Sequence, residues 1–222
     1  MDENIHELTI TLPEIDRNVS EALRSIRTSL LYTGVTKVIA VTSSIPDEGK
    51  TVVSVQLASQ FASLGKRVLL VDCDLRKPKI KRMLGVKWSV TGLSECLSSQ
   101  ADFSIYSTSV DHLYVLLSGK IPPNSSELLS NGKLEKMLKV LKERFDYIII
   151  DTPPAVGAVD IQIIGSMVDG ILLVIRSNYV KMSVVRNVVK QLERNNIRII
   201  GAILNGVKKT DKDYYYYYYY EY

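Results

Sequence analysis

Six short apolar segments, separated by stretches with helical periodicity, constrain the fold of this chain more than any other feature of its sequence. They cover residues 37–42, 67–72, 113–117, 147–151, 170–175 and 198–204. Apolar residues in these segments do not alternate with polar ones, which is typical of parallel strands buried on both faces. Spacings of three and four predict helices over residues 14–32, 51–64, 80–84, 93–97, 133–145, 161–168 and 181–195. Right-handed crossovers between such elements give a doubly wound α/β domain, with a mainly parallel sheet and helices on both faces.

Composition excludes several other classes of protein. The 222 residues are 46% hydrophobic, which is enough for one domain with a sizeable core. No apolar run approaches the roughly 18 residues of a membrane span, and the acidic N-terminus lacks the basic region of a signal peptide. Two cysteines, Cys73 and Cys96, make no disulfide framework, so we expect a cytoplasmic protein. The net charge of +4 is too small to require nucleic acid, although it suits a phosphate-bearing ligand.

The first apolar strand leads into a phosphate loop. In a doubly wound sheet, ligands bind at the carboxyl ends of the strands, so the residues that follow each strand matter most. Residues 43–51 read SSIPDEGKT and stand between a strand and a helix, as the pattern G-x-x-x-x-G-K-[ST] requires, except that Ser44 replaces the first glycine. Lys50 would reach the β- and γ-phosphates, and the Thr51 hydroxyl would bind Mg²⁺. The fold is therefore P-loop NTPase-like, with candidate nucleotide-binding residues Ser44, Asp47, Glu48, Gly49, Lys50, Thr51 and Val52.

Carboxylates follow the second strand. Asp72 and Asp74 lie two residues apart, where an extended chain directs both to one side. They face the phosphate loop if the second strand neighbours the first. One carboxylate would then serve a hard cation and the other would orient a hydroxyl nucleophile. Arg76 would clamp phosphate or anchor a partner chain. The alternative is a polar strand end with a helix cap before Pro78.

Two further strand ends carry polar side chains. Asp151 closes an apolar strand before two prolines and looks like the Walker B aspartate that holds the metal. Asn205 ends the last strand, at the corner that often meets the base in nucleotide folds. No N-K-x-D signature is present, which favours adenine over guanine. The alternative for Asn205 is a residue in a left-handed turn.

Four motifs together resemble the bacterial tyrosine kinases of capsule and exopolysaccharide operons. They are S-x-x-P-x-E-G-K-T over residues 43–51, VLLVDCDLRKP over 68–78, IPPNSSELL over 121–129 and YIIIDTPP over 147–154. The resemblance covers nearly the whole chain and implies transfer from ATP, with Mg²⁺, to tyrosine. It implies Lys50, Asp72 and Asp74 as catalytic residues and Thr51, Asp74 and Asp151 as metal ligands. How Asp72 and Asp74 divide their roles stays open.

The ends of the chain differ from its middle. Thirteen tyrosines are present, and eight of them fall in the last nine residues. We predict an N-terminal arm over residues 1–13, a P-loop kinase domain over 14–207 and a flexible tyrosine-rich tail over 208–222. The stretch from Leu8 to Leu12 is either an edge strand or part of the arm. The resemblance makes the cluster the phosphoacceptor, namely Tyr214, Tyr215, Tyr216, Tyr217, Tyr218, Tyr219, Tyr220 and Tyr222; the alternative is a low-complexity artefact or a disordered end.

The resemblance also implies partners. Glu21, Arg24 and Arg27 match a Glu-x-x-Arg-x-x-Arg motif that closes a ring-like homo-oligomer, although a solvated helix face with an internal Glu–Arg pair gives the same spacing. Phosphorylation in trans follows from such a ring. Other expected partners are a transmembrane activator of a polysaccharide export system, which would hold the chain at the inner face of the membrane, and a tyrosine phosphatase.

Two other functions are alternatives to the kinase function. A partitioning or septum-placement ATPase carries a signature lysine five positions before the invariant lysine, and Ile45 stands there in this chain. An ATP-binding scaffold without kinase activity would not need the three carboxylates. Incubation with labelled ATP distinguishes the three functions by phosphotyrosine, by phosphate release alone, or by neither.

Overall fold

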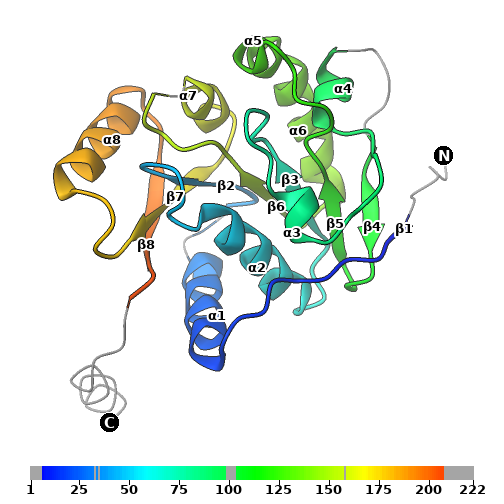
Figure 1. Cartoon of the computed structure of the whole chain (residues 1–222), viewed down its shortest axis with the longest axis horizontal. Coiled ribbons are helices and arrows are strands. Elements are labelled where there is room, and N and C mark those ends of the chain that lie inside the picture. Colours follow the sequence, from blue (N-terminus) through cyan, green and yellow to red (C-terminus); the bar gives the residue numbers. More distant parts are fainter. Residues whose placement is uncertain (1–6, 33, 35, 99–103, 158, 208–222) are drawn as a thin grey trace.

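A single eight-stranded sheet organises the chain. The computed structural model describes residues 7–32, 34, 36–98, 104–157 and 159–207. The strand order is β1-β4-β5-β3-β6-β2-β7-β8, and every neighbouring pair is parallel except the antiparallel pair β4–β5 (Figure 1). The strands are β1 (Glu7–Leu8), β2 (Val38–Ser43), β3 (Val68–Asp72), β4 (Tyr106–Thr108), β5 (Leu113–Leu116), β6 (Tyr147–Asp151), β7 (Gly170–Arg176) and β8 (Ile199–Asn205). The doubly wound, mainly parallel architecture is confirmed.

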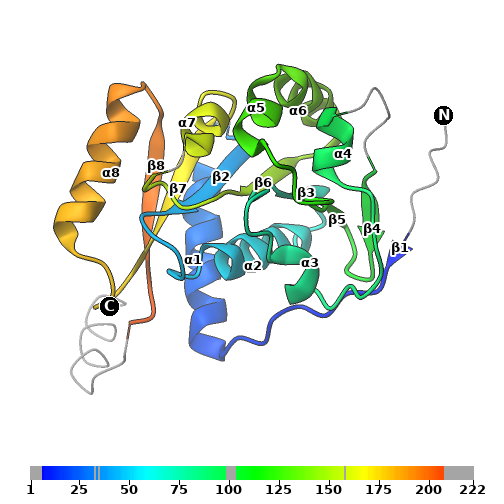
Figure 2. The same ribbon diagram turned by 45° about the horizontal axis from the view of Figure 1, so that its top comes forward.

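Helices cover both faces of the sheet. They are α1 (Arg17–Tyr32), α2 (Lys50–Ala62), α3 (Ile80–Met83), α4 (Leu93–Ser98), α5 (Ser125–Ser130), α6 (Lys133–Arg144), α7 (Asp160–Gly165) and α8 (Met182–Arg194). Figure 2 shows α1, α2 and α3 below the sheet and α4 to α7 above it, with α8 beside β8. Two clusters of buried side chains match these layers. One joins α1, α2 and α3 to the sheet, and the other joins α4 to α8 to the opposite face.

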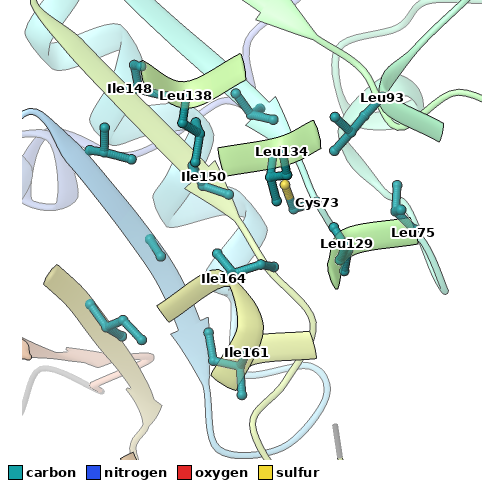
Figure 3. Packing of buried hydrophobic residues seen from close by; sticks show 14 of the residues in the cluster. Cys73, Leu75, Leu93, Leu129, Leu134, Leu138, Ile148, Ile150, Ile161 and Ile164 are labelled. Carbon is teal, nitrogen blue, oxygen red and sulfur yellow. The ribbon is translucent and has the colours of Figure 1, made fainter. Parts of the chain in front are cut away.

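The central strands are apolar because both of their faces are covered. All residues of β2 and β3 are buried, as are the last four residues of β6. On the α6 side, Leu138 lies beside Ile148 and Ile150 of β6 (Figure 3). These contacts hold β6 in the middle of the sheet, where its last residue, Asp151, is fully buried.

The six predicted strands are confirmed, each within one residue at either end. Two elements were not predicted, β4 and α5, and both are short. Of the stretch Leu8–Leu12, only Leu8 lies in a strand, at the end of β1, which pairs with β4 at the edge of the sheet. Helix α1 begins three residues later than predicted because the Asp16 carboxylate caps it, accepting a hydrogen bond from Val19 N at 2.9 Å.

The condition set for Asp72 and Asp74 to face the phosphate loop is not met by the strand order. The second predicted strand, β3, does not neighbour the first, β2, because β6 lies between them. The predicted tail, residues 208–222, and residues 1–6 of the predicted arm lie outside the described residues. Across the described ranges, none of the helices has the length and apolar character that crossing a bilayer requires.

The packing of α6 on β6 gives a stability prediction. Leu138 is 2% exposed, whereas Val140 on the same helix is 44% exposed. Leu138→Ala should lower the free energy of unfolding by about 2–5 kcal/mol, because it opens a cavity against Ile148 and Ile150. Val140→Ala is the matched control and should change it by no more than about 0.5 kcal/mol. Urea denaturation measures both, and equal losses would contradict the assigned packing.

Candidate active site

The loop between β2 and α2 has the backbone of a phosphate loop. Gly49, immediately before α2, has φ +93°, and Asp47 has φ +65°. A Cβ atom on Gly49 would lie 2.1 Å from Asn205 Nδ2, so glycine is required for space as well as for conformation. The loop follows the carboxyl end of β2 and leads into α2, so the N-terminus of α2 lies at the edge of the sheet where an anion can bind.

Glu48 holds this loop in place. Its carboxylate is fully buried and accepts hydrogen bonds from Ile45 N at 2.8 Å and from Arg176 N at 3.0 Å. Its carbonyl oxygen accepts a hydrogen bond from Asn205 Nδ2 at 2.8 Å. The Glu48 side chain therefore binds within the loop itself. Its predicted contact with nucleotide would have to come from its backbone.

Asn205 is not the left-handed turn residue that one alternative expected. The left-handed turn falls on the next residue, Gly206, with φ +67°, and Asn205 is not among the residues with positive φ. Its amide ties the end of β8 to the phosphate loop. This side chain therefore fixes the corner at which a base would be read, and its contact with adenine stays a prediction.

Lys50 meets two of the predicted carboxylates. Its Nζ atom lies 3.1 Å from Asp74 Oδ2 and 3.5 Å from Asp151 Oδ2, and all three side chains are buried. The Thr51 hydroxyl donates to Asp151 Oδ2 at 2.8 Å. The convergence of the phosphate loop with Asp74 and Asp151 is thus present, although β6 separates β2 from β3.

Ser54 completes this cluster and was not predicted. Its hydroxyl lies 3.0 Å from Asp151 Oδ1 and 2.9 Å from the carbonyl oxygen of Lys50. A sequence signal was available, because Ser54 follows Thr51 by three residues in a largely apolar helix. A second polar residue on the same buried helix face as Thr51 points to a shared polar neighbour in the sheet.

Asp72 is buried as completely as Asp151 but is less well hydrogen-bonded. Among the described residues, its carboxylate accepts only long hydrogen bonds, from Asp74 N at 3.3 Å and Ile80 N at 3.4 Å. Burial raises the pKa of Asp72 well above its usual range, and the charges of Asp151 and Asp74 raise it further. Asp72 is therefore the carboxylate most ready to take up a proton.

Lys50 and Asp151 respond to the same environment. Burial raises the pKa of Asp151, while Lys50 and the Thr51 hydroxyl partly oppose that shift. Burial alone would lower the pKa of Lys50, but Asp151 and Asp74 raise it above its usual value. Lys50 is thus a charged ammonium group whose only close partners among the described side chains are carboxylates and the Thr51 hydroxyl.

Arg76 is held by its own chain. Its guanidinium group makes two contacts with the buried carboxylate of Asp160, Nε at 2.7 Å and Nη2 at 3.2 Å, and Nη2 also donates to Ser126 Oγ at 2.9 Å. Ser126 Oγ and Asp160 Oδ1 are hydrogen-bonded as well. This bidentate pair uses the fork of the guanidinium within the subunit, and the clamping of phosphate or anchoring of a partner chain by Arg76 stays a prediction.

The three predicted interface residues lie on α1 in different surroundings. Glu21 and Arg24 are exposed, and Glu21 pairs with Arg17 at 3.0 Å rather than with Arg24 or Arg27. Arg27 is partly buried and donates to the carbonyl oxygen of Gln60 at 3.0 Å, near the end of α2. The internal Glu–Arg pair within the motif is therefore wrong, and Arg27 has a role inside the subunit.

The donor set suits a nucleotide and a hard cation. Carboxylates and a threonine hydroxyl are ligands that Mg²⁺ prefers, usually together with substrate phosphates. Within the described ranges, no group of three or more His, Cys, Asp or Glu residues is arranged to hold a metal ion alone. The Ser44 hydroxyl, fully buried in the loop, has no hydrogen-bond partner among the described atoms, which suits a site completed by a ligand.

Comparison with known proteins agrees with this geometry. Residues 34–213 match the family model ParA, described as NUBPL iron-transfer P-loop NTPase. The tyrosine-protein kinase CpsD of Streptococcus agalactiae is 37% identical over 201 residues, which cover 89% of this chain and 88% of that protein.

Solved structures show the same relationship. The kinase domain of the Escherichia coli tyrosine kinase ETK matches with a TM-score of 0.80 and 33% identity, over 86% of this chain and 78% of that one. The septum site-determining protein MinD of Pyrococcus horikoshii, solved with Mg-ADP, matches with a TM-score of 0.67 and 26% identity, over 80% and 73% of the two chains. The chain therefore belongs to the bacterial tyrosine-protein kinases, a family of P-loop nucleotide-binding proteins.

Proposed function

We propose that this chain transfers the γ-phosphoryl group of ATP to tyrosine hydroxyls of its own C-terminal cluster, in trans. The observation that carries the proposal is the meeting of Lys50 with Asp74 and Asp151 beside the phosphate loop. Family membership supports the chemistry, since the relatives are tyrosine-protein kinases.

Lys50 and the loop position the phosphates. The Lys50 ammonium group is on a flexible stem, so it can leave Asp74 and Asp151 for the more strongly charged β- and γ-phosphates. Thr51, Asp74 and Asp151 are the groups that would hold Mg²⁺. When bound, this ion supplies positive charge to the β- and γ-phosphate oxygens.

Asp72 is the candidate base. The bond from the γ-phosphorus to the ADP oxygen breaks, a bond to the tyrosine oxygen forms, and the hydroxyl proton passes to the Asp72 carboxylate. A pKa raised by burial and by Asp151 strengthens Asp72 as a proton acceptor. Asp74 is hydrogen-bonded to Lys50 Nζ and to Lys77 N, so it is better placed to position the Lys50 ammonium group than to accept the proton.

The direction of β8 supports transfer between subunits. β8 runs parallel to β7, and Asn205 at its end contacts the phosphate loop. From Asn205 to Tyr222 the chain has 18 residues, with a flexible span on the order of 23 Å. That length can reach a neighbouring site, whereas its own site requires the linker to reverse direction.

The exposed residues of α1 support assembly. Glu21 and Arg24 point away from the domain, so they are free to contact a second copy in a ring, and Arg27 joins α1 to α2 beneath them. Within this proposal, a transmembrane activator holds the kinase at the inner face of the membrane. Cycles of phosphorylation and removal by a tyrosine phosphatase then regulate capsule or exopolysaccharide synthesis.

Loss of Lys50 provides the first test. Lys50→Met should abolish phosphotyrosine in the tail, because no ammonium group remains to hold the transferring phosphate. Lys66→Met is the matched control, since Lys66 is exposed and precedes β3 at the opposite edge of the sheet. Phosphosite mapping after incubation with Mg-ATP measures both, and full phosphorylation of the Lys50→Met chain would refute the proposal.

Asp72 gives a prediction with a pH signature. Its folded pKa lies above the ordinary value of 3.8, so ionised Asp72 destabilises the fold and stability is lost as pH rises through the folded pKa. Asp72→Asn should therefore stabilise the nucleotide-free chain increasingly as pH rises, by about 1.4 kcal/mol for each unit of pKa shift. It should also abolish transfer, because an amide accepts no proton.

Denaturation at several pH values, without nucleotide, measures this gain in the free energy of unfolding. Asp111→Asn is the control, since Asp111 is exposed. At a pH well below 3.8, Asp72 is protonated in both states, and the pH-dependent part of the difference from wild type should vanish. A gain that does not depend on pH would contradict the electrostatic explanation, and retained kinase activity would contradict the role as base.

A mixing experiment tests transfer in trans. The Lys50→Met chain with an intact tail is incubated with an active chain that lacks residues 214–222. Phosphotyrosine should appear on the intact tail, because only the partner has a working site. An unmodified tail would mean that transfer occurs within one chain.

A further inference from the structure

One segment beside the active site carries an unusual concentration of positive charge. Between Leu75 and Ser94 the chain has no acidic residue and six basic ones, here called the basic segment: Arg76, Lys77, Lys79, Lys81, Arg82 and Lys87. The other 22 Lys and Arg residues of the chain are outnumbered by its 24 Asp and Glu residues. The positive net charge of the protein therefore comes from this segment.

The basic segment borders the phosphate loop. It begins two residues after Asp74, and Lys77 N donates to Asp74 Oδ1 at 3.0 Å. Lys79 Nζ lies 2.7 Å from the carboxylate of Asp47, which is part of the loop. The pKa of Asp47 is lowered first by this bond and also by the charges of Lys77 and Arg176, which therefore face the same carboxylate.

Most of these charges are not neutralised within the subunit. Arg76 pairs with Asp160 and Lys79 with Asp47. The other four, Lys77, Lys81, Arg82 and Lys87, form no ion pair with any described residue, and all but the partly buried Lys81 are exposed. Such a field attracts an anionic group over roughly a Debye length of 8–10 Å.

The tyrosine cluster is an anion of matching charge once it is modified. Each phosphotyrosine adds roughly −1.5 to −2 charges and three acceptor oxygens. The cluster is also tethered near such sites, since Asn205, from which the tail leaves the sheet, contacts Glu48, the neighbour of Asp47 in the loop. In the proposed ring, the tail reaches the basic segment of the neighbouring subunit that phosphorylates it, and the tether gives a high effective concentration there.

We propose that the basic segment binds the phosphorylated form of residues 214–222. The proposal rests on the proposed function, because that reaction supplies the phosphotyrosines. The exposed ammonium and guanidinium groups of Lys77, Arg82 and Lys87 bind phosphate oxygens, and unmodified tyrosines offer them no charge. A bound product occupies the approach to Lys50, so the kinase limits its own turnover as its tail fills with phosphate.

The single tryptophan provides a direct probe. Trp88 follows Lys87 and is 52% exposed, so its fluorescence responds to a ligand on the basic segment. The full chain is first treated with a tyrosine phosphatase and then titrated, without nucleotide, with synthetic peptides of residues 214–222. The fully phosphorylated peptide should change the Trp88 emission and bind at least tenfold more tightly than the unphosphorylated peptide, with an affinity that falls as salt rises.

Charge-reversal variants test whether the phosphopeptide binds at the basic segment. Lys77→Glu with Arg82→Glu should weaken phosphopeptide binding by roughly tenfold or more. Lys37→Glu with Lys66→Glu makes the same change in charge at the opposite edge of the sheet, where both residues are exposed and precede β2 and β3, and should leave binding unchanged. Equal affinity for both peptides, or equal losses in the two variants, would overturn the proposal. So would binding to vesicles of anionic phospholipid in place of the phosphopeptide, which would assign the segment to a membrane surface.

The peptide experiment is separate from the test of kinase activity. The phosphotyrosines are made by synthesis, so binding is measured whether or not the chain produces them. A chain that binds the phosphopeptide but never phosphorylates its tail would refute the proposed function alone. A chain that phosphorylates its tail but does not bind the phosphopeptide would refute only the proposed role of the basic segment.

Discussion

The contact of the Lys50 ammonium group with Asp74 and Asp151, beside the buried Asp72, governs the carboxyl edge of the sheet. Three carboxylates and one ammonium group lie together with almost no access to water. Desolvation of such groups costs several kcal/mol per ion unless each finds a partner. Lys50 alone cannot compensate three negative charges, so the raised pKa of Asp72 follows from its position. The site is thus least favourable when it is empty of cations, which is the state that a metal and a nucleotide would relieve.

A second set of contacts holds that arrangement rigid. Thr51 and Ser54 tie the first turn of α2 to Asp151 at the end of β6. Glu48 ties the loop to β7, and Asn205 ties it to β8. The loop is therefore fixed from several strands at once, and its N–H groups are oriented before any ligand binds. Such preorganisation lowers the cost of stabilising charge on a transferring phosphoryl group.

The elements that could be predicted from sequence are those whose signal is local. Asp72, Asp74 and Asp151 stand at the ends of buried strands, and parallel strands bring such ends to one edge whatever their order. The order itself could not be predicted, because no local pattern places β6 between β2 and β3. β4 was not predicted, because it has only three residues and pairs antiparallel with β5.

Side-chain partners were harder to predict than positions, for a related reason. The Glu48 carboxylate bonds to backbone on β7, more than a hundred residues further along the chain, and no local pattern indicated this partner. Arg76 meets Asp160 at the start of α7, a partner that no local pattern indicated. Both outcomes depend on the spacing of distant elements, since a buried or bidentate charge takes whichever partner the packing supplies.

Charge is distributed around the site in two layers that act over different distances. The carboxylates are buried and act at short range, because they lie behind the phosphate loop and the start of α2. The basic segment is largely exposed, so its field extends into solvent over roughly 8–10 Å. An anion approaching from solvent therefore meets positive charge first and the carboxylates only after it has reached Lys50. A neutral tyrosine is insensitive to the outer layer and a phosphorylated one is attracted by it, so the two layers together distinguish the substrate of the reaction from its product.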